Sequence, residues 1–168
     1  QRYLYHALTQ AISGAQDRIY LTTPYFLPTH RLLRLLKRAA RRGVDVRLLT
    51  PLHSDHPIVD LAAATYYHEA LIAGIKSFQY QPSMLHAKTS VIDNTWSTVG
   101  SMNLDNVSLR YNFEGNIVST DSQFTTELAQ HFEGDLMRAE ELTLAMWGER
   151  SWVGRVLEWL VWPLRKLL

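Results

Sequence analysis

Cysteine is absent from this chain of 168 residues, and no apolar run is as long as a membrane-spanning helix. The first absence excludes disulfides and thiolate metal sites, and it fits a reducing compartment. The second predicts a domain without a transmembrane segment, and we expect no signal peptide. The chain is also nearly neutral, with a net charge of +1, so the overall charge predicts no nucleic-acid partner.

Residues that build a core are present in ordinary amounts. Hydrophobic residues make up 46% and charged residues 20% of the chain, as in folded globular proteins. The length suits one domain with its own core. Basic residues are unevenly spread, because six lysines and arginines fall between His30 and Arg42. Their side chains could meet anionic lipid head groups or simply face solvent, and the sequence leaves both interpretations open.

The first half of the chain alternates between strand and helix patterns. Thr29 is placed to cap the second helix, and Gly43 and Gly74 are placed to end the second and third helices. The predicted helices are 3–15, 31–42 and 56–74, and the predicted strands are 17–26, 44–51 and 75–81. This alternation predicts an α/β fold with a largely parallel sheet covered by helices.

The second half has a different pattern. The predicted strands are 83–93, 96–101 and 111–120. A turn at 93–95, with the sequence Asp-Asn-Thr, joins the first two strands as a hairpin. A long helix is predicted over 122–147, weakened near Gly134.

His86 and Lys88 lie in the first strand of that hairpin with one residue between them. Alternation in a strand places both side chains on one face, about 6–7 Å apart. A phosphate suits both, because an ammonium neutralises its charge and an imidazole can attack phosphorus or protonate a leaving oxygen. Gly100 would let the backbone approach a ligand, and Ser101 and Asn103 would add donors for phosphate oxygens.

Asp93, at the end of the same strand, is expected to brace the site or cap the turn rather than to attack a substrate. These residues also have an ordinary interpretation as parts of a buried hairpin. A strand histidine is often a hydrogen-bonded structural residue, and Gly-Ser-x-Asn is often a turn. The joint spacing of all six residues from His86 to Asn103 favours the functional interpretation.

The pattern His-x-Lys-x4-Asp-x6-Gly-Ser-x-Asn resembles the HKD motif of the phospholipase D superfamily. The segments "TTPYFLP", "AARRGVDVRLLTP" and "GSMNLDNVSLRYNFEGN" resemble the second half of bacterial cardiolipin synthases, over about residues 8–150. Many superfamily members have Arg where this chain has Val107, and one branch of the synthases has an aliphatic residue there. The resemblance implies an αβα sandwich with a mixed central sheet flanked by helices.

The resemblance also implies catalytic roles. His86 would be either the nucleophile that becomes a phosphohistidine or the general acid and base. Lys88 would hold the phosphate, and Asp93 belongs to the motif. Glu114 would accept a hydrogen bond from the motif's own histidine and so fix its tautomer.

Binding roles are implied for a second group of residues. Ser101 and Asn103 would contact the phosphate, and Tyr25, Phe26 and Gly100 would line the substrate pocket. Neither a metal nor another cofactor is implied.

Family chemistry uses two HKD motifs that face each other, and this sequence contains one. A second HKD half would come from another copy of the chain or from the N-terminal half of a longer protein. The beginning at Gln1, together with the resemblance to the second half of a synthase, leads us to expect the latter.

Tryptophan gathers at the end of the chain, where four of five fall in the last 22 residues. The segment 151–168 has aliphatic residues on one side of a helical projection and charged residues on the other. We therefore divide the chain into a catalytic domain, 1–150, and an amphipathic helix that binds a membrane interface or packs on protein. Pro163 would bend or end this helix.

Three functions follow from these patterns. The leading prediction is a peripheral enzyme on the cytoplasmic side of a bacterial membrane that makes cardiolipin and glycerol from two phosphatidylglycerols. The alternatives are a homodimeric HKD phosphodiesterase or nuclease, and a non-catalytic module that pairs with a complete enzyme. The tryptophan-rich tail favours phospholipids over nucleic acid as partners, and the complete His86, Lys88, Asn103 and Glu114 set favours catalysis.

Overall fold

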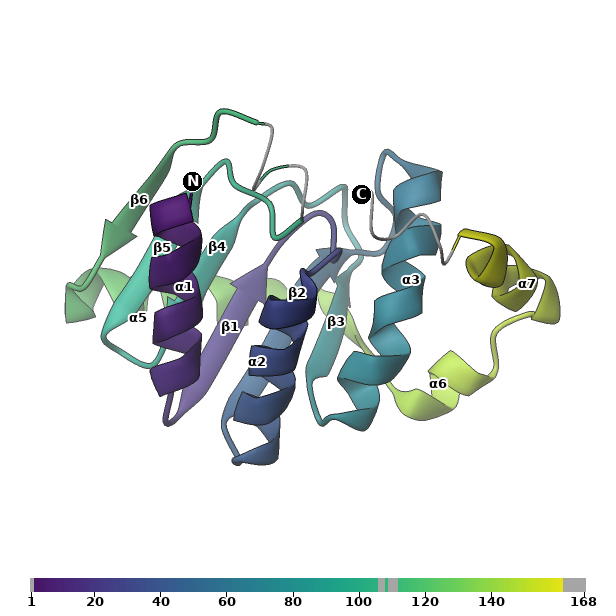
Figure 1. Cartoon of the computed structure of the whole chain (residues 1–168), viewed down its shortest axis with the longest axis horizontal. Helices are drawn as coiled ribbons and strands as arrows, with labels where there is room; N and C mark the ends of the chain where they lie inside the picture. The colour runs from purple at the N-terminus through teal and green to yellow at the C-terminus, as the bar shows by residue number, and fades with distance from the viewer. Residues whose placement is uncertain (1, 106–107, 109–111, 162–168) are drawn as a thin grey trace.

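A mixed sheet of seven strands forms the centre of the molecule (Figure 1). The computed structural model describes residues 2–105, 108 and 112–161. The strands lie in the order β6-β5-β4-β1-β2-β3-β7. Their bounds are β1 Arg18–Thr22, β2 Asp45–Pro51, β3 Lys76–Tyr80, β4 Thr89–Ile92, β5 Trp96–Gly100, β6 Asn116–Ser119 and β7 Ala139–Leu142. β1, β2 and β3 run parallel, and the other neighbours pair antiparallel.

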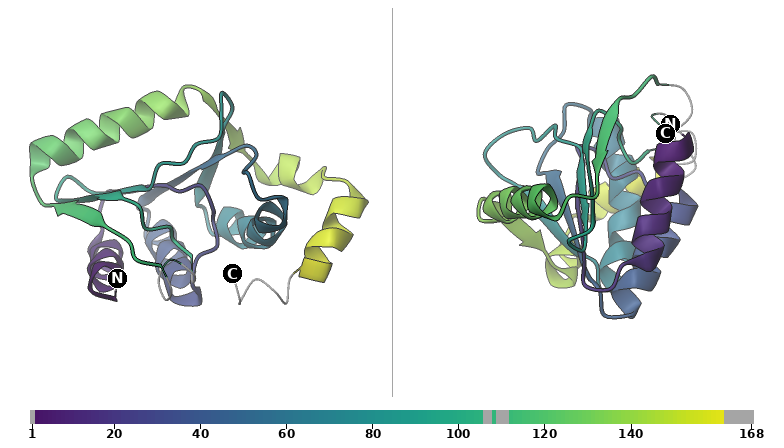
Figure 2. Two further views of the ribbon diagram at one scale, coloured as in Figure 1. Left: turned by 90° about the horizontal axis from the view of Figure 1, so that it is seen from above. Right: turned by 90° about the vertical axis from the view of Figure 1, so that its left-hand side faces the viewer.

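Helices cover both faces of this sheet (Figures 1 and 2). α1, α2 and α3 lie on one face, α5 crosses the other, and α6 and α7 follow beyond α3. Their bounds are α1 Arg2–Gly14, α2 His30–Arg41, α3 Pro57–Ile72, α5 Ser122–Leu136, α6 Leu144–Gly148 and α7 Trp152–Val161. The predicted αβα sandwich with a mixed sheet is confirmed.

α2 illustrates how local signals build this layer. The Thr29 hydroxyl accepts a hydrogen bond from the backbone N–H of Leu32 at 3.1 Å and so caps the helix. Leu32 and Leu36 are buried on the side that faces the sheet. Gly43 and Gly74 have φ angles of +93° and +88°, a left-handed conformation that glycine adopts without a steric penalty. Both glycines therefore end their helices as predicted.

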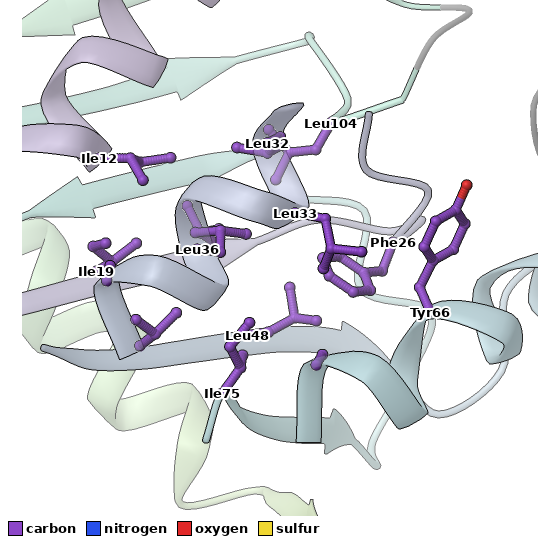
Figure 3. Close-up of a cluster of buried hydrophobic side chains, with 14 of the residues drawn as sticks. Ile12, Ile19, Phe26, Leu32, Leu33, Leu36, Leu48, Tyr66, Ile75 and Leu104 are labelled. Carbon is purple, nitrogen blue, oxygen red and sulfur yellow. The ribbon is translucent and has the colours of Figure 1, made fainter. Parts of the chain in front are cut away.

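Two apolar cores hold the layers together, one on each face of the sheet. The larger core lies under α1, α2 and α3, where Ile12, Leu36 and Leu48 converge (Figure 3). The smaller core lies under α5, where Phe132 stacks on Tyr20 with ring centroids 4.7 Å apart. Each large side chain buried in this way contributes about 1.5–3 kcal/mol of transfer free energy. The cores make the sheet a rigid frame for the loops at its edges.

Predicted and observed elements differ in the second half. The helix predicted over 122–147 ends at Leu136 and is followed by β7 and α6, so the prediction of one long helix is wrong. β7 pairs antiparallel with β3 and is the last strand on that side of the sheet. The hairpin turn at 93–95 is confirmed, but β4 and β6 begin later than predicted, at Thr89 and Asn116. Pairing between distant segments decides these bounds.

The C-terminal helix α7 contacts α3. Residues 162–168, with the predicted break at Pro163, lie outside the described residues, as does Val107. Over the ranges that the structure describes, no helix is both long and apolar enough to cross a bilayer. The division of the chain at residues 150 and 151 stays a prediction.

Candidate active site

The loops that follow the parallel strands β1, β2 and β3 gather at one edge of the sheet, the upper edge in Figure 1. β1, β2 and β3 end there, β4 begins there and β5 ends there. Open α/β sheets bind ligands at the carboxyl ends of their parallel strands, where loops vary on a rigid frame. Most predicted site residues lie in these loops, at 23–29, 81–88 and 101–105.

His86 and Lys88 lie just before β4, so the prediction that both are strand residues is wrong. Their side chains nevertheless meet. The Lys88 Nζ lies 2.8 Å from His86 Nδ1 and donates to the His86 carbonyl oxygen at 2.7 Å. The lysine is 8% exposed, whereas His86 is an exposed residue. The pair thus combines an accessible imidazole with a cation held by two contacts.

The environment of Lys88 is partly shielded from water. Burial lowers the pKa of Lys88 below that of a free lysine. The carboxylates of Glu114, Asp105 and Asp55 oppose this shift, because each of them favours the charged ammonium. A bound phosphate would restore part of the solvation that the ammonium loses on burial. The position is therefore suited to an anionic ligand.

Gly100 lies against the segment that leads into β6. Its N–H donates to the Lys88 carbonyl oxygen at 3.2 Å and ties the end of β5 to the site. A Cβ on Gly100 would lie 2.3 Å from the carbonyl oxygen of Gly115 and 2.5 Å from Cγ of Asn116. Only glycine allows the chain before β6 to come this close. The role of Gly100 in lining the substrate pocket stays a prediction.

Ser101 and Asn103 are oriented differently from each other. The Ser101 hydroxyl accepts a hydrogen bond from the Gly115 N–H at 3.0 Å, so it holds the neighbouring segment in place. The Asn103 side-chain oxygen is buried and has no hydrogen-bond partner among the described residues. Because amide oxygen and nitrogen positions are interchangeable in a structure, this unpaired position can present an NH₂ donor to a ligand. Asn103 is thus the better candidate for a phosphate contact.

Glu114 lies before β6, so the prediction that it is a strand residue is wrong. It accepts a hydrogen bond from Asn112 Nδ2 at 3.2 Å, and the described structure has no hydrogen bond between Glu114 and His86. Its charge does act on Lys88. The tautomer-fixing role that the family resemblance implies for Glu114 stays a prediction.

Asp93 lies at the opposite end of β4 from His86. Its carboxylate accepts hydrogen bonds from the backbone N–H groups of Gln16, Asp17 and Arg18 at 3.1, 2.9 and 3.0 Å. Burial alone would raise the pKa of Asp93, but these hydrogen bonds lower it overall. The aspartate therefore braces the turn against the start of β1, far from the phosphate position.

Tyr25 and Phe26 follow β1 and point in different directions. The edge of the Tyr25 ring meets the His86 ring, with centroids 6.3 Å apart and planes at 81°. Phe26 is buried in the larger core against Tyr66 and Tyr67 (Figure 3). Tyr25 thus belongs to the edge of the site, and the prediction that Phe26 lines the substrate pocket is wrong.

Asp55 is a site residue that sequence reasoning missed. Its carboxylate accepts a hydrogen bond from the Tyr25 hydroxyl at 2.6 Å and lies 3.8 Å from Nε2 of His56. That hydrogen bond lowers the pKa of Asp55, while burial and the carboxylate raise the pKa of Tyr25 to about 12. Its place in the loop that follows the parallel strand β2 is the signal that could have identified it.

Asp105 is a second missed residue. It is buried, accepts a hydrogen bond from the Ser108 N–H at 2.6 Å, and favours the charged form of Lys88. The site therefore surrounds one buried lysine with several acids. Within the part of the chain that the structure describes, no three His, Asp or Glu side chains converge as metal ligands.

Known proteins resemble this chain over most of its length. Cardiolipin synthase A of Pseudomonas fluorescens is 44% identical over 133 residues, which are 79% of this chain and 28% of that protein. Cardiolipin synthase A of Pseudomonas aeruginosa is 42% identical over 134 residues, 80% of this chain and 27% of that protein. The chain thus spans little more than a quarter of the length of these relatives.

Solved structures share the fold at lower identity. Nuc from Salmonella typhimurium, a phospholipase D family member, has a TM-score of 0.71 and 20% identity, over 83% of this chain and 90% of that chain. Phosphatidylserine synthase from Haemophilus influenzae has a TM-score of 0.73 and 12% identity, over 98% of this chain and 42% of that chain. Residues 8–136 match the family described as cardiolipin synthase, PLD-like domain. The chain belongs to this phospholipase D-like cardiolipin synthase family.

Proposed function

We propose that this domain contributes one half of an active site that makes cardiolipin and glycerol from two phosphatidylglycerols. The observation that carries the proposal is the contact between an accessible His86 and a buried Lys88, 2.8 Å apart. In this pair the lysine would hold a phosphodiester and the imidazole would act on its phosphorus. The relatives named cardiolipin synthase A support cardiolipin as the product.

The reaction would proceed in two displacements. A histidine nitrogen attacks phosphorus, the bond from phosphorus to the glycerol oxygen breaks, and that oxygen takes a proton from a second histidine. The free hydroxyl of another phosphatidylglycerol then returns a proton to this second histidine and attacks the phosphohistidine. The phosphorus–nitrogen bond breaks, and cardiolipin leaves. His86 would serve as either of the two histidines, and Lys88 and Asn103 would hold the phosphate oxygens.

A second HKD half is the partner that this mechanism requires. We propose that it comes from the N-terminal half of a longer protein, since the chain matches only a part of its relatives. Pairing of two identical chains would serve the same chemistry. The proposed location is the cytoplasmic side of a bacterial membrane, where phosphatidylglycerol is available.

A homodimeric phosphodiesterase or nuclease is the second candidate function. It is favoured by the size of Nuc, because this chain covers 90% of that phospholipase D family member. A non-catalytic module is the third, and the intact His86 and Lys88 contact argues against it. Product analysis separates the three.

Lipid mass spectrometry with phosphatidylglycerol vesicles tests the proposal. We expect the complete protein to form cardiolipin and glycerol, and His86→Ala to form neither. His131→Ala is the matched control, because His131 is an exposed histidine on α5, on the opposite face of the sheet from α1, α2 and α3. Hydrolysis of an oligonucleotide without cardiolipin would favour the nuclease, and equal products from His86→Ala would exclude His86 from catalysis.

A further inference from the structure

We propose that α2 and α7 together form the surface by which this domain docks on an anionic phospholipid bilayer. The two helices are far apart in sequence, and α3 joins them into one row. α3 is linked to α2 by the ion pair of Glu69 with Lys37, and it contacts α7 (Figures 1 and 2). Docking does not depend on the reaction at His86, so the test of docking and the test of the proposed function fail separately.

The outer side of α2 carries a row of arginines. Arg31, Arg34, Arg38 and Arg41 are exposed and follow one another at helical spacing, while leucines bury the opposite side. α2 contains no acidic residue, and in the described part of the chain none of these arginines has an ion pair. Four positive charges without an opposite partner attract a negatively charged surface.

A groove of about 380 Å³ lies beside this row, between α2 and α3. Its lining is basic except for Leu33 and Glu69. Glu69 is already neutralised, because its Oε2 lies 3.0 Å from the Nζ of Lys37. The groove therefore presents a net positive charge and several N–H donors, a combination that holds phosphate groups.

α7 adds apolar surface at the end of the same row. Trp152 and Trp159 are 75% and 73% exposed. The other exposed apolar side chains of α7 are Val156, Leu157 and Leu160. Glu158 is mostly buried and pairs with Arg150, so this acid does not oppose an anionic surface. Tryptophan beside aliphatic residues is typical of helices that lie in a membrane interface.

A bilayer fits this surface better than a nucleic acid does. Proteins that bind single strands interleave aromatic and basic side chains, so that bases stack while phosphates are neutralised. α2 has no Phe, Tyr or Trp, and the exposed tryptophans lie on a different helix. Separate basic and apolar regions match charged head groups above hydrocarbon.

The docking surface also begins beside the candidate active site. Thr29 caps α2 shortly after Tyr25, whose ring edge meets His86. A bilayer held against α2 would therefore lie next to the edge of the sheet that carries the His86 and Lys88 pair. Lipid head groups would then reach the site without leaving the interface.

Sedimentation with vesicles tests the electrostatic part of this proposal. The protein is mixed with vesicles of phosphatidylcholine alone or with added phosphatidylglycerol. We expect binding to the anionic vesicles, and release as salt rises from about 0.1 M to about 0.5 M, because the Debye length shrinks. Equal binding to neutral vesicles, or binding that ignores salt, would overturn the proposal.

Charge variants locate the surface. Arg34→Gln/Arg38→Gln removes two charges from α2 and should weaken binding to anionic vesicles about thirty-fold. Ser122→Glu/Gln130→Glu lowers the net charge equally on α5, on the opposite face, and should leave binding unchanged. Both variants alter exposed residues, and circular dichroism checks that they fold. An equal loss in the two variants would make overall charge responsible and exclude α2.

A tryptophan variant tests the apolar part. Trp152→Ser/Trp159→Ser should weaken vesicle binding about tenfold at every salt concentration, because apolar insertion is not screened. Unchanged binding would remove α7 from the surface. A single-stranded oligonucleotide that displaced the vesicles through the same arginines would identify a nucleic-acid site instead and refute the proposal.

Discussion

The two ends of β4 carry residues of one sequence motif and use them in different ways. Before the strand, the Lys88 Nζ contacts His86 at 2.8 Å at an accessible edge of the sheet. After the strand, the Asp93 carboxylate turns toward the backbone N–H groups of Gln16, Asp17 and Arg18. Regular spacing within a motif therefore does not imply that its residues share a site. The residues before β4 are accessible to a ligand, and the residue after β4 stabilises the fold.

The pKa shifts of Lys88 and Asp93 also differ between the two ends of β4. Burial opposes the charged form at both, since it lowers the pKa of Lys88 and by itself would raise that of Asp93. At Asp93 the hydrogen bonds from the backbone overcome this effect and lower the pKa. At Lys88 the nearby acids do not overcome the effect of burial, so the pKa of Lys88 is lowered. We expect removal of Asp93 to affect stability and removal of His86 to affect activity.

The sharpest contrast is expected for His86→Ala. Loss of a nucleophile or general acid should lower transferase activity of the complete protein by about a thousand-fold or more. The free energy of unfolding should change by less than about 0.5 kcal/mol, because His86 is exposed. Lipid product analysis and urea unfolding measure the two quantities. A large loss of stability would mean that this end of β4 is also structural.

Gly100→Ala tests a structural residue that lies next to Lys88. Its new Cβ would lie 2.3 Å from the Gly115 carbonyl oxygen, so we expect a loss of about 1–3 kcal/mol in unfolding free energy. Gly115→Ala is the matched control, since a Cβ there meets nothing within 4 Å. Urea unfolding of both variants decides the matter. Equal stabilities would mean that the close approach at Gly100 is not required.

Asp93→Asn tests the structural end through pH. At about pH 7 the variant should be less stable by about 2 kcal/mol, because hydrogen bonds to a charged acceptor are weakened. The contribution of Asp93 is present above the ordinary aspartate pKa and is lost as pH falls through its lowered folded-state pKa. The two proteins should therefore converge in acid. Calorimetry across this range measures the difference, and Glu127→Gln, at an exposed residue of α5, serves as the control. A gap that persists in acid would contradict an electrostatic cause.

The smallest expected effect is that of Tyr25→Phe. Phenylalanine keeps the ring edge against His86 and loses the hydrogen bond to Asp55, so activity should fall about tenfold. The pKa of Asp55 should rise toward that of a free aspartate, because this hydrogen bond is the main cause of its lowering. Carboxylate titration by NMR measures the shift. Tyr3→Phe, at an exposed tyrosine of α1, should change neither property.

Local chemistry in the sequence was sufficient for a large part of this protein. Helical spacing, the Thr29 cap and the glycines at positions 43 and 74 predicted the first three helices, because these signals act between residues a few positions apart. The spacing from His86 to Asn103 predicts a phosphate site, because those residue types suit that ligand, and this site stays a prediction. Both kinds of inference need no knowledge of distant segments.

Only the tertiary structure decided how distant segments meet. Tyr25 and Phe26 are neighbours in sequence, yet Tyr25 lies against His86 and Phe26 is buried in the larger core. The packing of the loop that follows β1 decides which side chain is buried. Asp55 reaches Tyr25 from another loop, and Gly100 is required by the chain before β6. β7 became a strand because β3 offered an edge to pair with. Each outcome depends on the packing free energy between parts of the chain that are remote in sequence. A local sequence pattern does not contain this information.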